Sequence, residues 1–397
     1  MGLATSTNYN IRYDGAAGGD VLSNNTTRGG LAVGDVNGDG LGDLVIGAYL
    51  ADNNSRAGSG SAYVMFSTLV DDNTTTGNNL GLATSTNYNI RYDGATASDN
   101  LTTNRNIAIG DVNGDGLKDL VLGAPEADNG GSTSGSAWVF FSTLVDDNTT
   151  TGNNLDLATG GNYNIRYDGV ATGTPSLTRN GAIAIGDVNG DGLRDLVLGA
   201  SQEDEGATNS GSVYVIFSTL VDNNTTTGNN LGLATSTNYN IRYDGQAASH
   251  FLPAEGAVFT GDVNGDGLGD LVMGTLNADN VTTDTGSAWT VLSTLIDDVG
   301  TTTGNNQGLG TAANYTDRYD GAAGSVFMIN DRAVAIGDAD GNGTSDLVLG
   351  ATHTDILPAA ISTRNSAPWK ISHLHFSEIE RPGFFMAWGS DSMTRRA

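Results

Sequence analysis

The acidic segment GDVNGDGLGDLVIGA, which begins at Gly34, returns almost unchanged at Gly110, Gly186 and Gly261, and in a looser form at Gly337. The first aspartates of these five copies are separated by 76, 76, 75 and 76 residues. Self-similarity at a fixed period predicts a repeat architecture, in which each unit packs against its neighbours. The 397-residue chain is therefore expected to fold as an array of five related units.

Each unit is expected to consist of β-strands. Short apolar or alternating runs occupy residues 30–35, 43–48, 60–69 and 88–94, and Gly, Asn, Thr and Asp fill the spaces between them. The polar stretch DDNTTTGNN at 71–79 is interpreted as a linker. Four strands per unit are typical of a propeller blade. The predicted fold is an all-β propeller of five four-stranded blades, with an open propeller-like repeat array as the alternative.

The repeats are predicted to span residues 1–352, and the divergent segment 353–397 is treated as a C-terminal tail that closes the last blade. Because an open sheet edge promotes aggregation, we expect the ring to close. In this hypothesis the strand Tyr9–Gly15 becomes the outer strand of the fifth blade, and Trp369–Phe376 supplies its third strand. The alternative is an open crescent whose ends pair with other chains.

The acidic segment has the residue types of a calcium site. Calcium takes six to eight hard oxygen ligands, and alternate side chains of a tight loop can point at one centre. Gly40 permits the sharp turn at the sixth place. The apolar run that follows leaves no acid at the twelfth place, so the loop is expected to be the tip of a β-hairpin rather than part of a helix pair. The predicted ligands in the first loop, 35–43, are Asp35, Asn37, Asp39, the main-chain carbonyl of Leu41, and Asp43.

The other copies give four equivalent sets, so the sequence predicts five Ca²⁺ ions in total. A single such loop would be weak evidence, because Asp, Asn and Gly are also ordinary turn residues. Five copies in register favour the metal, and magnesium is less suitable because it prefers few protein ligands. The sets are Asp111, Asn113, Asp115, Leu117 and Asp119 (loop 111–119); Asp187, Asn189, Asp191, Leu193 and Asp195 (loop 187–195); Asp262, Asn264, Asp266, Leu268 and Asp270 (loop 262–270); and Asp338, Asp340, Asn342, Thr344 and Asp346 (loop 338–346).

The charge of the chain limits its partners. With 45 acidic and 17 basic residues, the net charge of −28 disfavours nucleic acid and suits divalent cations. The chain has no cysteine, which excludes disulfides and thiolate metal sites. No apolar run approaches the roughly 20 residues that span a bilayer, so we expect no membrane insertion. No signal peptide is visible at the N-terminus.

Two further sets of residues recur once per repeat. We expect the arginines to pair with a nearby acid across an edge strand; a ring of ligand-binding arginines is the alternative. We expect the aromatic residues at one strand position to form the core between blades. The sets are Arg12, Arg91, Arg166, Arg242 and Arg318, and Tyr63, Trp138, Tyr214 and Trp289.

The segments GDVNGDGLKDLVLGAPEAD (Gly110–Asp128) and SGSAWVFFS (Ser134–Ser142) resemble FG-GAP repeats. These are the blades of the integrin α-subunit β-propeller and of related repeats in bacterial surface and secreted proteins. The likeness covers nearly all of residues 8–352. It implies calcium in hairpin loops of the blades and a role in adhesion or ligand display at the cell surface or outside the cell, and it does not imply catalysis.

The predicted function is therefore a non-catalytic, calcium-binding, extracellular adhesion or interaction module with an unidentified protein or glycan ligand. The sequence shows no nucleophile elbow, phosphate-cradling loop or reactive cysteine. A structural surface or filament-forming protein with self-association remains an alternative, favoured by the near-identical repeats. A carbohydrate-active enzyme on a propeller scaffold is the second alternative, because aspartate pairs can serve a glycosidase.

Overall fold

The computed structural model describes residues 5–23, 30–71, 76–146, 148, 150–171, 176–222, 226–278, 285–300, 302–321, 334–339 and 345–350. The predictions for Asp340, Asn342 and Thr344 of the fifth loop, and for the tail 353–397 with its proposed strand Trp369–Phe376, lie outside these residues.

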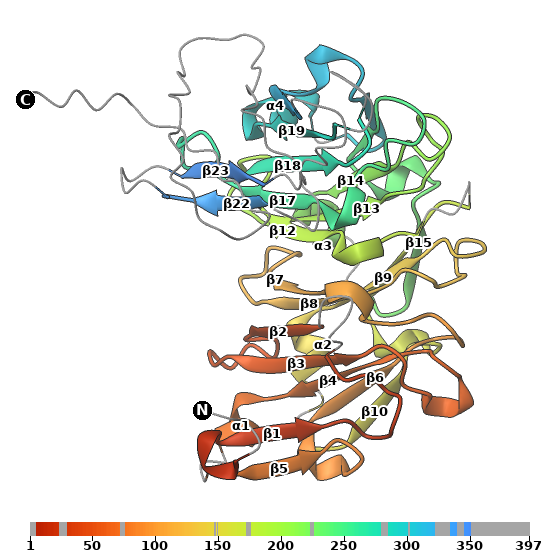
Figure 1. The fold of residues 1–397 in the computed structure, drawn as a ribbon, viewed down its shortest axis with the longest axis vertical. Coiled ribbons are helices and arrows are strands. Elements are labelled where there is room, and N and C mark those ends of the chain that lie inside the picture. The colour runs from red at the N-terminus through yellow and green to blue at the C-terminus, as the bar shows by residue number, and fades with distance from the viewer. Residues whose placement is uncertain are drawn as a thin grey trace, which may run out of the picture.

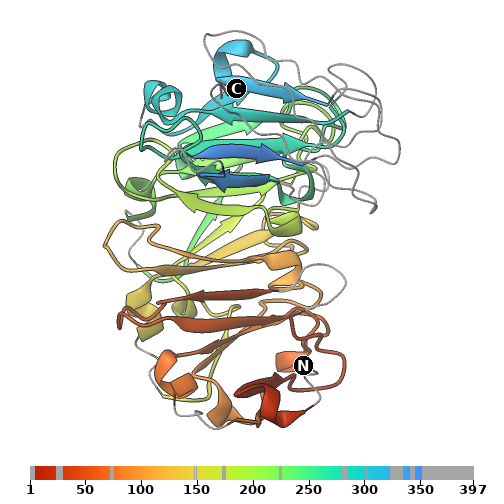
Figure 2. The ribbon, with the colours of Figure 1, turned by 60° about the vertical axis from the view of Figure 1, so that its left-hand side comes forward.

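The described residues form a stack of small β-sheets that extends along one axis (Figures 1 and 2). The first complete sheet holds β2 (Leu31–Gly34), β3 (Asp43–Ala48), β4 (Ser61–Met65), β6 (Ile90–Asp93) and β10 (Asn153–Asp156). The second holds β7 (Ile107–Gly110), β8 (Asp119–Ala124), β9 (Ser136–Phe140), β11 (Ile165–Asp168) and β15 (Asn229–Gly232). The third holds β12 (Ile183–Gly186), β13 (Asp195–Ala200), β14 (Ser212–Ile216), β16 (Ile241–Asp244) and β20 (Asn305–Gly308).

Smaller sheets lie in the first and last parts of the chain. A four-stranded sheet holds β17 (Val258–Gly261), β18 (Asp270–Thr275), β19 (Ser287–Val291) and β21 (Asp317–Asp320). Two-stranded sheets pair β1 (Ile11–Asp14) with β5 (Asn78–Gly81), and β22 (Val334–Gly337) with β23 (Asp346–Leu349). The described part of the chain is thus an all-β repeat array, as predicted.

Short helical segments connect the strands. The α-helices are α1 (Ser67–Asp71), α2 (Ser142–Asp146), α3 (Ser218–Asp222) and α4 (Ser293–Val299). The 3-10 turns are η1 (Ser6–Asn8), η2 (Asn53–Ser55), η3 (Ser85–Asn87), η4 (Thr103–Arg105), η5 (Gly160–Asn162), η6 (Arg179–Gly181), η7 (Ser236–Asn238), η8 (Ala254–Gly256) and η9 (Ala312–Asn314). None of the helices in the described part has the length and hydropathy that crossing a membrane requires.

The strand predicted over 60–69 is wrong in its second half. β4 ends at Met65 and α1 begins at Ser67. The backbone N–H of Phe66 donates to the side chain of Asn89, and that of Ser67 donates to the side chain of Asp43, at 2.8 and 2.9 Å. Because side chains take the donors that a sheet ladder would use, the strand stops there and the chain turns into a helix.

The linker predicted at 71–79 also contains an element that the sequence did not reveal. Its last residues, Asn78 and Asn79, belong to β5, which pairs in parallel with β1. The equivalent strands β10, β15 and β20 pair in parallel with β6, β11 and β16, so three sheets have five strands rather than the expected four. Tyrosine hydroxyls hold this strand; for example, Tyr88 donates to Oδ1 of Asn154 at 2.8 Å.

The predicted closure of the ring is wrong. The strand within Tyr9–Gly15 is β1, and it pairs with β5 instead of completing the fifth blade. It lies at one end of the stack, whereas β22 and β23 lie near the other end (Figure 1). Successive sheets are displaced along the long axis, so the alternative, an open propeller-like array, describes the arrangement.

The recurring aromatic residues form the core, as predicted. Tyr63, Trp138, Tyr214 and Trp289 are fully buried on the third strand of each sheet. Tyr92 of one sheet packs against Phe140 of the next, with ring centroids 4.2 Å apart. Burial of such large side chains is the main stabilising contribution between repeats.

Candidate metal centre: the acidic loops

The first acidic loop joins β2 to β3, so the predicted hairpin tip is confirmed. Gly34 pairs with Asp43 at the last position of the antiparallel ladder. Gly40 has a φ of +86°, which explains why the turn at the sixth place needs glycine. The other described loops repeat this geometry, with φ of +90°, +90° and +87° at Gly116, Gly192 and Gly267.

Within the loop, side-chain oxygens accept hydrogen bonds from the loop's own backbone. Asp35 accepts from the N–H groups of Gly38 and Gly40 at 2.8 and 2.9 Å. Asp39 accepts from the N–H of Leu41 at 2.8 Å, and the Asn37 amide donates to Asp39 at 3.2 Å. These contacts bring the first, third and fifth side chains of the predicted ligand set into one turn. The second and fourth loops contain the same contacts.

The ninth-place aspartate has a structural role that the sequence did not reveal. Asp43 is fully buried and accepts from the N–H of Val36 and the N–H of Ser67, both at 2.9 Å. It therefore ties the loop to the start of α1. Asp119, Asp195 and Asp270 make the equivalent pairs of bonds. The only signal in the sequence is the nearly constant separation between the acidic loop and the following FSTL motif.

The carboxylates of one loop are close enough to affect one another. Burial is the largest cause that raises the pKa of Asp119 to about 7; hydrogen bonds from Val112 and Ser142 oppose it, and the charges of Asp115 and Asp111 add to it. In the third loop the same causes raise the pKa of Asp195 to about 8. A cation in the loop would relieve this repulsion.

The donor chemistry of the loops fits a hard cation. Oδ1 of Asp187 is buried and has no hydrogen-bond partner among the described residues. A carboxylate offers about four lone-pair sites, so Asp43 retains acceptor capacity beyond its two hydrogen bonds. The side chains do not already converge: within the described ranges, no group of three or more acidic or histidine side chains surrounds a common point. Calcium binding would therefore require rotation of side chains within the loop.

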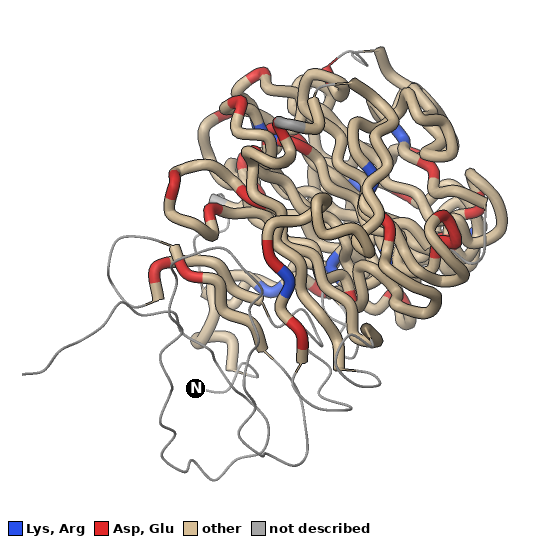
Figure 3. The backbone as a smooth tube through the Cα atoms, turned by 90° about the horizontal axis from the view of Figure 1, so that it is seen from above, with Lys and Arg blue, Asp and Glu red and all other residues tan. Residues whose placement is uncertain are grey.

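Four of the five predicted ligand sets lie entirely within the described residues. In the fifth set only Asp338 and Asp346 are described, and Asp346 accepts from the N–H of Ala339 at 2.8 Å, like the other ninth-place aspartates. Viewed from above, acidic residues occur on loops at the outline of the molecule as well as within it (Figure 3).

Replacing Asp119 with Ala is expected to destabilise the protein by about 2–4 kcal/mol, because it leaves the buried N–H groups of Val112 and Ser142 without an acceptor. Urea denaturation in chelator measures this effect apart from metal binding. Asp119→Asn keeps one acceptor oxygen and should lose clearly less. Equal stability of the Ala variant and the wild type would contradict the structural role.

The recurring arginines pair with an acid, as expected, but the acid lies two residues further along the same strand rather than across it. Arg91 donates through Nε and Nη2 to Asp93 at 2.7 and 2.8 Å, and the pair is largely buried. Arg12, Arg166, Arg242 and Arg318 make equivalent pairs. The guanidinium groups are thus occupied by structural ion pairs.

The third repeat contains a buried acid that sequence reasoning missed. Glu203 is fully buried at a place where Ala51, Ala127 and Ala278 stand in other repeats. Its Oε1 accepts from the Tyr214 hydroxyl, and its Oε2 has no partner among the described residues. Burial raises the pKa of Glu203 to about 8, against the opposing effects of Tyr214 and Arg242. Aligning the repeats with one another reveals it, because only the third repeat has a glutamate where the compared repeats have alanine.

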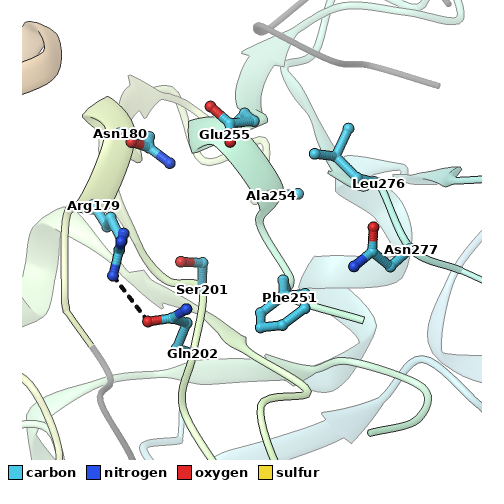
Figure 4. Close-up of a pocket in the computed structure, with 9 residues that line it drawn as sticks. All are labelled: Arg179, Asn180, Ser201, Gln202, Phe251, Ala254, Glu255, Leu276 and Asn277. Carbon is cyan, nitrogen blue, oxygen red and sulfur yellow. Dashed lines mark hydrogen bonds between the residues drawn. The ribbon is translucent and has the colours of Figure 1, made fainter. Parts of the chain in front are cut away.

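A cavity of about 300 Å³ lies between the third and fourth repeats (Figure 4). Arg179 on η6 donates to Oε1 of Gln202 at 2.8 Å on one side of it. Phe251 and Asn277 lie on the other side. Amides, charged groups and one aromatic ring line it.

A family model described as FG-GAP repeat matches residues 28–65, 103–140 and 179–216. Each matched segment contains the first three strands of a sheet together with its acidic loop. No curated protein matches the sequence. Among solved structures, the chain is similar to the crystal structure of exotype rhamnogalacturonan lyase YesX, with a TM-score of 0.35 and 14% identity, covering 84% of this chain and 46% of that chain. This chain thus spans about half the length of the lyase. The three matched segments of the chain, 28–65, 103–140 and 179–216, are thus FG-GAP repeats.

Proposed function

We propose that this protein is a calcium-binding interaction module that works outside the cell or at the cell surface and has no catalytic activity. The observation that carries the proposal is the repetition of one acidic hairpin loop with the same internal contacts along the array. A catalytic centre normally uses one set of residues, whereas here the carboxylates recur in each repeat.

In each loop, calcium would be held by the side chains at the first, third, fifth and ninth places and by the main-chain carbonyl at the seventh. In the second loop these are Asp111, Asn113, Asp115, Asp119 and the carbonyl of Leu117. The metal would supply positive charge among three carboxylates and fix the hairpin tip. Five ions would take the formal charge of the chain from −28 to −18, since each adds two positive charges.

The extracellular setting rests on the family likeness and on the expected affinity. Loops of this kind that work in extracellular modules bind calcium with Kd values of about 10⁻⁴–10⁻³ M, which match calcium levels outside cells. The binding partner would be a protein or a glycan that docks on the exposed loops.

Equilibrium dialysis against ⁴⁵Ca²⁺ tests the proposal directly. The wild type is expected to bind about one ion per repeat. Asp115→Ala should remove one ion and leave the others, because contacts in a repeat array are mostly between neighbours. Asp146→Ala, which removes an exposed carboxylate on α2, is the matched control and should bind as many ions as the wild type. Absence of saturable binding, or loss of all ions in the Asp115 variant, would contradict the proposal of independent loop sites.

A structural, assembly-forming role is a second candidate. The open array favours this role, because the two ends of the stack differ from each other and lie on opposite sides of the molecule.

A further inference from the structure

Neighbouring repeats join through their innermost strands, and each junction has the same small contact. A Cβ placed on Gly34 of β2 would lie 2.7 Å from Cγ2 of Ile109 on β7. A Cβ placed on Gly110 would lie 2.8 Å from the side chain of Ile185. The corresponding distances are 2.4 Å from Gly186 to Thr260 and 3.1 Å from Gly261 to Ile336. A side chain of the later repeat thus sits directly on a glycine of the earlier repeat. We name these glycines the seat glycines.

The acidic loops of neighbouring repeats also contact each other. The side chain of Leu117 lies over Gly38 of the preceding loop, with its methyl groups 3.4 Å from a Cβ built there. Leu193 and Leu268 lie in the same way over Gly114 and Gly190. Three of the four junctions therefore place one β-branched residue and one loop leucine of the later repeat on glycines of the earlier one, and Leu117 and Leu193 stay 38% and 37% exposed there.

The first repeat presents these side chains to solvent. Val33 occupies the place of Ile109 and is 71% exposed, and Leu41 occupies the place of Leu117 and is 55% exposed. Leu31, beside them on β2, is 57% exposed. These are the three most exposed large hydrophobic residues of the described chain, and they gather at one end of the array.

The last repeat presents the complementary half of the contact. Gly337 on β22 is the fifth seat glycine, and nothing among the described residues lies within 4 Å of a Cβ built on it. Its four equivalents are each covered by a side chain of the next repeat.

Strand edges are open at both ends of the array, but β1 and β23 are not partners for each other, because a third strand such as β4 lies between these two positions in a complete sheet. Among the described residues β1 is bonded along one edge only, to β5, whereas β6, β11 and β16 pair along both edges. At the other end, β23 pairs only with β22 among the described residues, whereas β3, β8 and β13 each have a second neighbour. Exposed strand edges are templates for pairing with another chain.

We propose that the first repeat of one chain docks on the last described repeat of a second copy, with Val33 seated on Gly337 as Ile109 is seated on Gly34. A second copy is the occupant that fits, because the two ends are the two halves of a junction that occurs four times inside the chain. The ends lie far apart along the stack, so one molecule does not satisfy its own ends (Figures 1 and 2). A head-to-tail contact that does not close on itself extends into a linear assembly.

The charge of the protein sets the conditions for this contact. Two copies of net charge −28 repel each other. Salt shortens the range of this repulsion, because the Debye length is about 8 Å at 0.15 M and about 3 Å at 1 M. Association should therefore strengthen as the NaCl concentration rises. The junction involves no calcium ligand side chain, so the inference stands independently of the proposed calcium function.

Sedimentation velocity of the full-length chain over a concentration series, in chelator and 0.5 M NaCl, tests the proposal. The wild type should form a ladder of oligomers whose mean size grows with concentration. Val33→Asp blocks one end and Gly337→Leu fills the seat at the other, so each variant alone should remain monomeric. Both positions are exposed, and circular dichroism melts verify that each variant is folded. Thr143→Asp, which adds a charge at an exposed position of α2 away from both ends, should assemble like the wild type.

Mixing the two blocked variants gives the decisive result. The intact first repeat of Gly337→Leu can still dock on the intact last repeat of Val33→Asp, so the mixture should form dimers and nothing larger. A wild type that stays monomeric at all concentrations would overturn the proposal. Assembly of either single variant to the wild-type extent, or a monomeric mixture alongside an assembling wild type, would overturn it too and indicate a different contact.

Discussion

Calcium is expected to raise the unfolding temperature of the chelator-treated protein by roughly 10 °C or more. A ligand that binds only the folded state stabilises it by about 2.7 kcal/mol per site when its concentration is a hundredfold above Kd. For a Kd of about 10⁻⁴ M, that condition is met at about 10 mM calcium. Differential scanning calorimetry in 10 mM CaCl₂ and in EDTA measures the difference.

Magnesium at the same concentration is the control for ionic strength. It retains its water and prefers few protein ligands, so it should give a much smaller shift. An unfolding temperature that is the same in calcium and in EDTA would contradict the calcium proposal, whereas equal shifts with both metals would point to charge screening alone.

The second large effect is a loss of stability between about pH 4.5 and pH 8 that depends on Glu203. The ordinary pKa of its carboxyl is 4.5, and burial raises it to about 8 in the folded protein. Between these values the unfolded chain releases a proton that the folded chain keeps, so the free energy of unfolding falls as pH rises from about 4.5 to about 8. The difference corresponds to about 5 kcal/mol, at about 1.4 kcal/mol per pKa unit.

Glu203→Ala should abolish this fall. The variant recreates the arrangement of the first repeat, where Ala51 lies at the same place and the hydroxyl of Tyr63 is buried without a hydrogen-bond partner among the described residues. Urea denaturation at pH 5, 6.5 and 8 should show wild-type stability dropping relative to the variant. Glu203→Gln, which keeps the volume without the charge, should behave like the Ala variant. Parallel pH profiles for all three proteins would show that the carboxyl does not control stability.

The sequence predicted the features that are local and repeated. The acidic loop lies at a hairpin tip because Gly40 and its equivalents adopt positive φ between two apolar strands. The aromatic residues at the third strand form the core because their period matches the packing of the sheets. A pattern that returns five times in register leaves little freedom for another interpretation.

Features that depend on partners distant in the sequence were missed. The strand at Asn78–Gly81 carries no apolar alternation, and it forms because β1 offers an edge. The end of β4 is set by bonds from Phe66 and Ser67 to side chains more than twenty residues away in the sequence. Likewise, the buried place of Glu203 follows from the packing of Tyr214 and not from its neighbours in sequence.

Because of the parallel outer strands, the sheets do not correspond to separate, consecutive segments of the sequence. The first complete sheet takes strands from residues 31 to 156, and the second begins already at residue 107. The third spans 183–308 and the second runs to 232, so the sheets overlap in sequence like links of a chain. A protease that cuts between repeats anywhere from residue 11 to residue 320 therefore cuts within a sheet, and the two fragments remain joined by hydrogen bonds. For the same reason, none of the first four repeats can be excised as an independent folding unit, because each one leaves with a strand that belongs to its neighbour.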